Sequence, residues 1–194
     1  MAVSTTFGYH AGEDRLWISC AAWPQRVWLT RRMARAVIEL TVAVLEAPAA
    51  GGGDARPAAE RAAAEHDASL NRPQPGEQGH ALQMGREPPD APALGAAVLC
   101  TRFDLKPSGG TQIELCFHTP AGQRRLQLSR VGLHRWLHAM QMVLQATGWI
   151  DWPAPPDWLT RSYLPPALQK LLQAPLPASD LGPDEEDTPP PPAR

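Results

Sequence analysis

Hydrophobic and polar positions alternate most clearly in the second half of the chain. Ala97–Leu105 and Thr111–His118 both show the period of two that is typical of β-strands. The segment between them, Lys106–Gly110, contains a proline and two glycines, which favour a turn. We therefore predict a hairpin with Phe103 opposite Ile113, because this register places the apolar side chains of both strands on one face.

A third strand and a helix follow this hairpin. Arg124–Leu128 alternates again, and Ser129 is a good N-cap for a helix over Arg130–Thr147. Gly148 supplies a C-terminal stop. The apolar stripe of this helix recurs at helical spacing and consists of Leu133, Trp136, Leu137, Met140, Val143 and Leu144.

The first half of the chain repeats this plan in shorter form. Arg15–Ala21 and Arg26–Leu29 read as two strands. Thr30 then caps a predicted helix over Arg31–Glu46, which fades at Ala47–Pro48. Both halves thus contain a strand, a hydroxyl cap, an arginine and an amphipathic helix, which fits either an internal duplication or convergence on a common junction.

The two halves each offer a sheet face and a helix stripe that must cover one another. We predict the α+β class: ββα and βββα units forming one antiparallel sheet of about five strands, with two main helices on one face. Residues 14–47 and 95–150 together make this domain. The other segments are a flexible N-terminus over 1–13, a flexible linker over 48–94 in which Ala58–Ala68 could form a short exposed helix, a Trp/Pro-rich segment with a short helix over 151–173, and a disordered acidic Pro-rich tail over 174–194.

Charge and composition exclude several classes of protein. The formal net charge is -2, so no global positive charge draws the chain to nucleic acid or an anionic membrane. No apolar run approaches the roughly 20 residues that span a bilayer, and the N-terminus lacks the pattern of a secretory signal. We therefore expect a cytoplasmic protein with three reduced cysteines, Cys20, Cys100 and Cys116, of which the last two would be cross-strand neighbours.

Motifs for catalysis or cofactor binding are missing from the sequence. Gly51–Gly53 lacks the lysine and hydroxyl residue of a phosphate-binding loop, and no nucleophile elbow or zinc-protease motif occurs. We therefore expect no enzyme and no cofactor. One alternative stays open, a small metal protein or enzyme in which His134 and His138, one helical turn apart, are joined by His118 or Cys116. The other interpretation of the two histidines is a polar helix flank.

Tryptophan is the most suggestive residue type, with seven copies against two tyrosines and three phenylalanines. Trp17 and Trp28 fall on the strand face opposite the inward residues. An exposed aromatic pair is typical of a protein interface. Trp149, Trp152 and Trp158 in the following segment would either cover that face or bind a partner with it. The leading hypothesis is a non-enzymatic accessory, adaptor or assembly protein that binds a protein partner or a second copy of itself.

A nucleic-acid-binding module is the second hypothesis. Arginines gather near the two strand–helix junctions and could form one positive edge if the halves pack by pseudo-symmetry. The residues of this predicted basic patch are Arg26, Arg31, Arg32, Arg35, Arg124, Arg125 and Arg130.

Overall fold

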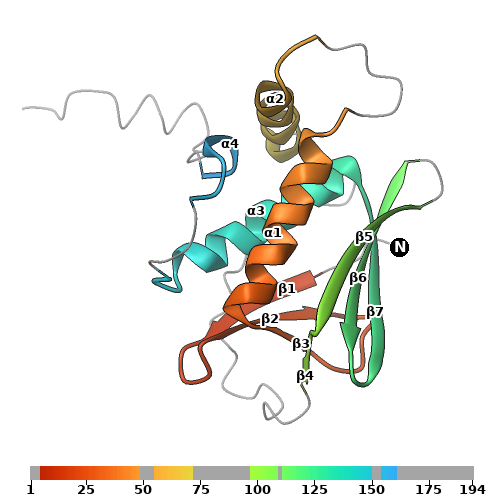
Figure 1. Cartoon of the computed structure of the whole chain (residues 1–194), viewed down its shortest axis with the longest axis vertical. Helices are drawn as coiled ribbons and strands as arrows, with labels where there is room; N and C mark the ends of the chain where they lie inside the picture. The colour runs from red at the N-terminus through yellow and green to blue at the C-terminus, as the bar shows by residue number, and fades with distance from the viewer. Residues whose placement is uncertain (1–4, 49–54, 72–96, 109–110, 150–153, 161–194) are drawn as a thin grey trace, which may run out of the picture. The chain divides into compact units, whose positions relative to one another are not determined.

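The computed structural model describes residues 5–48, 55–71, 97–108, 111–149 and 154–160, all within one compact unit, Met1–Arg161. The predicted segment over 174–194 and most of 151–173 lie outside the described residues. The fold class is confirmed as α+β (Figure 1). Its elements are β1 Thr5–His10, β2 Arg15–Cys20, β3 Val27–Leu29, α1 Arg31–Glu46, α2 Ala58–Asn71, β4 Val98–Leu99, β5 Arg102–Ser108, β6 Gln112–Thr119, β7 Gly122–Ser129, α3 Arg130–Gln145 and α4 Asp157–Thr160.

The strands form two sheets, where the sequence predicted one. The first sheet has the order β1-β2-β3-β4 and the second β5-β6-β7. The chain changes sheet between β4 and β5: the Cys100 amide donates to the Trp28 carbonyl at 2.9 Å, and the Thr101 amide donates to the His118 carbonyl at 2.8 Å. Because adjacent residues bond to different sheets, the predicted continuous strand over Ala97–Leu105 is divided in two.

The predicted hairpin exists, but its register is different. Phe103 lies opposite Phe117, and Leu105 lies opposite Leu115. The strands continue through Ser108, so the turn lies further along the chain than the sequence indicated. The apolar residues still share a face because the register moved by an even number of residues. Cys100 and Cys116 are not opposite one another, since Asp104 faces Cys116.

Two elements lie where the sequence predicted flexible segments. Thr5–His10 within the predicted flexible N-terminus forms β1, which pairs with β2 and contributes the buried Phe7 to the core. Within 48–94, α2 covers Ala58–Asn71 and is longer and less exposed than predicted. Its buried residues Ala62, His66 and Ser69 recur at helical spacing, but their small or polar side chains carry little hydrophobic signal.

Both long helices begin where the sequence predicted. The Thr30 hydroxyl accepts from the Met33 amide at 3.2 Å, and the Ser129 hydroxyl accepts from the Gly132 amide at 3.1 Å. Each cap satisfies a donor that the first helical turn leaves free. Gly148 has φ +66°, which an L-residue rarely adopts, and it lies just beyond α3.

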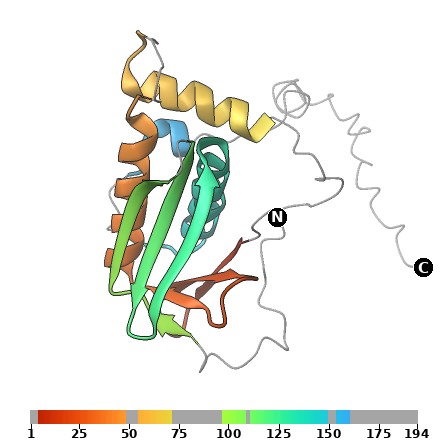
Figure 2. The ribbon, with the colours of Figure 1, turned by 90° about the vertical axis from the view of Figure 1, so that its right-hand side faces the viewer.

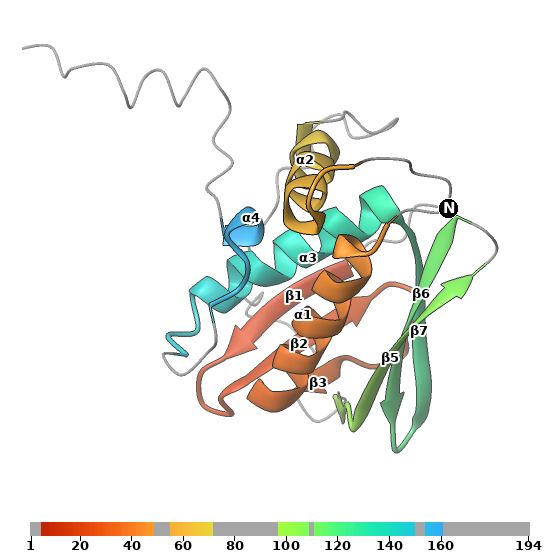
Figure 3. The ribbon, with the colours of Figure 1, turned by 45° about the horizontal axis from the view of Figure 1, so that its top comes forward.

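The core lies between the helices and the two sheets. Figure 3 shows α1 and α3 in front of the first sheet, and Figure 2 shows β5, β6 and β7 side by side with β5 toward α1. Phe7 of β1 packs edge-on against Trp136 of α3, with ring centroids 5.1 Å apart. Among the described helices, none has the length and hydropathy needed to cross a membrane.

We predict that Gly8→Ala destabilises the fold by about 1–3 kcal/mol, the usual cost of overpacking. A Cβ atom at position 8 would lie 2.3 Å from two ring carbons of Trp17. Urea denaturation followed by circular dichroism measures the change in the free energy of unfolding. Gly132→Ala in the first turn of α3 is the control, since a Cβ there meets nothing closer than 3.4 Å and helix propensity improves. Equal stability of the two variants would contradict the prediction.

Candidate functional site

The predicted aromatic face is present, but it is not exposed. Trp17 and Trp28 lie opposite one another in the β2–β3 register, on the face away from Leu16 and Ile18, and neither belongs to the main core cluster. The Trp17 indole crosses Gly8, and the Arg26 guanidinium lies 4.4 Å from a Trp17 ring centroid. The exposed fractions of Trp17 and Trp28 are only 4% and 6%. This pair therefore offers little surface to a partner.

The other described tryptophans do not cover this aromatic face. Trp149 is in the main core cluster and donates its indole N–H to Asp14 at 2.7 Å. Hydrogen bonds from Arg31, Trp149 and Tyr9 lower the pKa of Asp14 to about 2. Trp158 is also in the core cluster, and Trp152 lies outside the described residues.

The predicted arginine patch is divided among separate places. Arg31 pairs with Asp14 at the start of α1, whereas Arg130 lies at the end of that helix. The two ends of this 16-residue helix are about 24 Å apart. The remaining members are Arg32, which is exposed; Arg35, paired with Glu39; Arg26, above Trp17; and Arg124 and Arg125, hydrogen-bonded to Gln25 and Gln123. The single positive edge that the sequence predicted does not form.

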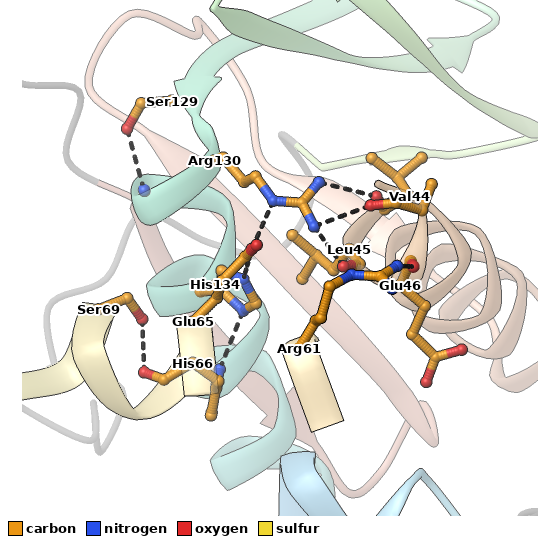
Figure 4. Close-up of polar contacts among 12 residues, drawn as sticks. Val44, Leu45, Glu46, Arg61, Glu65, His66, Ser69, Ser129, Arg130 and His134 are labelled. Atoms are coloured by element: carbon orange, nitrogen blue, oxygen red, sulfur yellow. Dashed lines mark hydrogen bonds and ion pairs between the residues drawn. The ribbon is translucent and has the colours of Figure 1, made fainter. Parts of the chain in front are cut away.

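Arg130 instead joins three helices at a polar junction, here called the helix junction and formed by Glu65, His66, Arg130, His134 and the last carbonyls of α1 (Figure 4). Its Nε donates to Glu65 Oε2 of α2 at 2.5 Å. Its Nη atoms donate to the carbonyls of Val44, Leu45 and Ala47. These carbonyls have no partners within α1, and a cation at the C-terminal end of a helix also complements the helix dipole.

Two buried histidines continue this network. His134 Nε2 lies 3.3 Å from Glu65 Oε2, and His134 Nδ1 lies 3.3 Å from His66 Nδ1. An ionised carboxylate only accepts, so the network assigns the proton of neutral His134 to Nε2. His134 Nδ1 is then an acceptor, and His66 Nδ1 carries the proton that it donates. A continuous chain of hydrogen bonds therefore runs from α2 through α3 to the end of α1.

The surroundings of this histidine pair are mostly apolar. The exposed fractions of His66 and His134 are 0% and 1%, and the Trp158 ring lies 5.2 Å from the His66 ring. Burial, followed by the neighbouring His134 and His138, lowers the pKa of His66 to about 3. Burial also lowers the pKa of His134 and of His138. All three imidazoles are therefore held in their neutral forms at neutral pH.

The structure does not assemble the predicted metal ligands. His134 and His138 share α3, but His118 lies on β6, where its Nε2 is 2.7 Å from Asp104. The described residues contain no group of three or more His, Cys, Asp or Glu side chains that could hold a metal ion. The sequence interpretation missed His66 and Glu65, because the small and polar residues at buried positions of α2 carry little hydrophobic signal.

The polar group on β5 and β6 lacks the geometry of an activated thiol. His118 Nε2 faces both Asp104, at 2.7 Å, and Cys116 Sγ, at 3.6 Å, so the nitrogen nearest the thiol is the one engaged by the carboxylate. In a catalytic arrangement, one ring nitrogen faces the nucleophile and the other faces the orienting group. Burial raises the pKa of the nearby Cys100 thiol to about 11.

An apolar cleft of about 480 Å³ lies between the end of α1 and the β5–β6 hairpin. On the core face of this hairpin Phe103, Leu115 and Phe117 are buried, whereas Leu105 and Ile113 are only half-buried. Since α1 ends at Glu46, helical cover does not reach the hairpin tip. We call this space the hairpin cleft. Its lining residues are Val44, Ala47, Pro48, Leu105, Lys106, Pro107, Thr111, Gln112, Ile113 and Arg130.

Comparisons with known proteins identify no relative. No protein-family model matches the chain, and neither the curated proteins nor the solved structures contain a significant match.

We predict that Arg130→Lys lowers the free energy of unfolding by about 2–3 kcal/mol, because a lysine cannot reach Glu65 and three carbonyls together. Arg125→Lys on the exposed side of β7 is the matched control and should stay within about 0.5 kcal/mol. Urea denaturation measures both changes. A loss in the control as large as that in the Arg130 variant would contradict this role for Arg130.

We also predict that Cys100 resists alkylation in the folded protein. With a pKa of about 11, roughly one thiol in a thousand is ionised at pH 8, and the residue is buried. Iodoacetamide labelling followed by peptide mass spectrometry should find Cys100 modified in urea but unmodified in buffer. Rapid labelling in buffer would show an activated, accessible thiol instead.

Proposed function

We propose that this protein is a non-enzymatic accessory or assembly protein, located in the cytoplasm, that binds a protein partner through the hairpin cleft. The observation that carries this proposal is the half-covered core face at the tip of the β5–β6 hairpin. Leu105, Ile113 and Val44 each remain partly accessible there, around a concave apolar space. Contiguous accessible apolar surface of this kind is typical of interaction sites.

The chemistry of the cleft supports binding over catalysis. Its ionisable lining residues are Lys106 and Arg130. The Arg130 guanidinium already donates to Glu65 and to three carbonyls, which leaves Lys106 as the exposed charge at the rim. An apolar floor with a polar rim is the usual composition of a protein interface. We therefore expect apolar side chains of the partner to enter the cleft.

This proposal keeps the class of function that the sequence indicated and changes the surface. The aromatic pair Trp17 and Trp28 was the expected interface, but its exposed fractions of 4% and 6% leave little area for contact. We prefer this proposal to nucleic-acid binding because Arg31, at the start of α1, and Arg130, at its end, lie at opposite ends of that helix.

Affinity isolation from the cells that produce the protein tests this proposal, with Ile113→Ser compared against Leu40→Ser. Both variants replace one apolar side chain by serine, but Ile113 lines the cleft while Leu40, 42% exposed, lies on the outer side of α1. We expect proteins bound by the wild type to be lost from the Ile113 variant, with at least a tenfold drop in yield, and retained by the Leu40 variant.

Light scattering of the purified protein over a range of concentrations covers the case in which the partner is a second copy. Circular dichroism confirms that both variants are folded before the comparison. If the partner is a different protein, the proposal fails when both variants retain the same proteins as the wild type. If the partner is a second copy, it fails when the wild type and Ile113→Ser self-associate equally.

A further inference from the structure

We propose that the docking of α2 onto α3 is a proton-sensitive latch, closed by the hydrogen bond between His66 and His134 and released by acid. The evidence for this latch comes from residues other than those of the proposed partner site, although the two share Arg130. It rests on the geometry of the helix junction, where two buried imidazoles from different helices face one another at 3.3 Å.

The hydrogen bond limits how many protons the docked pair can hold. In the neutral pair the His66 Nδ1–H donates to His134 Nδ1, while the His134 Nε2–H donates to Glu65. One added proton would go either to His66 Nε2, which keeps the donation from His66 Nδ1, or to His134 Nδ1, in which case His66 must accept. A second would place two N–H groups and two positive charges face to face at 3.3 Å. The docked pair therefore holds at most one extra proton.

Among the described residues, the anion that contacts the pair is the Glu65 carboxylate, which favours a proton on His134 but is outweighed there by burial. Glu65 is the carboxylate that contacts His134, and its Oε2 already accepts from Arg130 at 2.5 Å. The Glu46 carboxylate accepts from the Trp158 indole at 3.0 Å. The other titratable and charged groups of the elements packed here are Glu60, Arg61, Glu65 and Asp67 from α2, Arg130, Arg135 and His138 from α3, Asp157 from α4, and, at the end of α1 that meets α2, Glu46.

The direction of the pH effect follows from the pKa values. Burial is the main cause that lowers the pKa of His66 to about 3, and it lowers the pKa of His134 and His138 as well. Once α2 is released, the imidazoles return toward the ordinary value of about 6.5 and bind protons. The released state thus holds more protons in acid. Docking is fully favoured above about pH 6.5 and is progressively lost as the pH falls toward 3.

The expected size of the effect can be taken from His66 alone. A shift from about 6.5 to about 3 weakens docking roughly 25-fold between pH 7 and pH 5. The apolar contribution of α2 is small, because its buried residues are Ala62, His66 and Ser69. The other contacts that hold α2 are polar: Glu65 accepts from Arg130, Arg61 donates to the Glu46 carbonyl at 2.9 Å, and Arg135 donates to the Ser69 carbonyl at 2.7 Å.

Amide hydrogen exchange of the full chain tests the latch at pH 7 and pH 5, after correction for the intrinsic pH dependence of exchange. We expect the opening constant of the α2 amides, over Ala58–Asn71, to rise by about tenfold or more at pH 5, while the β6 amides keep their protection. In His66→Asn the side-chain amide can still donate to His134 but does not titrate, so the rise should be at least about fivefold smaller.

The matched control is His118→Gln, which removes a histidine outside the junction and retains a donor for Asp104. In this control the opening constant of the α2 amides should rise between pH 7 and pH 5 as much as it does in the wild type. If His66→Asn fails to dock at pH 7, ring-nitrogen NMR of the wild type decides the matter: His66 must stay neutral at pH 5 wherever α2 is docked. The latch is refuted if wild-type α2 opens equally at both pH values, or if His66 titrates near pH 6.5 while α2 remains protected.

Discussion

Arg130 is the first residue of α3, and its guanidinium reaches the end of a different helix. Three carbonyls of α1 and the Glu65 carboxylate of α2 all accept hydrogen bonds from it. A helix end leaves carbonyls that need donors, and a partly buried guanidinium such as that of Arg130 is better held when a carboxylate balances its charge. The guanidinium of Arg130 supplies donors to the carbonyls at the end of α1, and Glu65 of α2 balances its charge. The positions of all three helices therefore depend on Arg130.

The strand–cap–helix junction explains why this arginine stands where it does. Ser129 ends β7 and caps α3, which fixes Arg130 in the first helical turn beside the end of α1. The equivalent arginine of the first half, Arg31, follows Thr30 in the same way but pairs with Asp14 at the surface. The same sequence of strand, hydroxyl cap and arginine thus places Arg130 between three helices in one half and Arg31 in an exposed ion pair in the other. The packing of the helices is what distinguishes the two arginines.

This difference marks what local pattern could predict. The caps, both long helices and the inward faces of the strands follow from residue type and spacing, because each depends on neighbours close in sequence. The division of the strands into two sheets and the role of α2 depend on distant contacts, whereas β1 was missed although it pairs with the adjacent β2. His66 is the clearest example: an alanine-rich helix carries little hydrophobic signal, and its docking rests on a polar bond to a residue far along the chain, His134.

The helix junction and the hairpin cleft share Arg130, and this places them in one physical system. Release of α2 would withdraw Glu65 and leave the guanidinium with carbonyl partners alone, next to the space lined by Val44 and Ile113. An arginine without its carboxylate is a stronger attractor for an anion. Under the two proposals, acid would thus leave the Arg130 cation, which already lines the cleft, without its carboxylate, and a carboxylate on the partner would gain a place to pair.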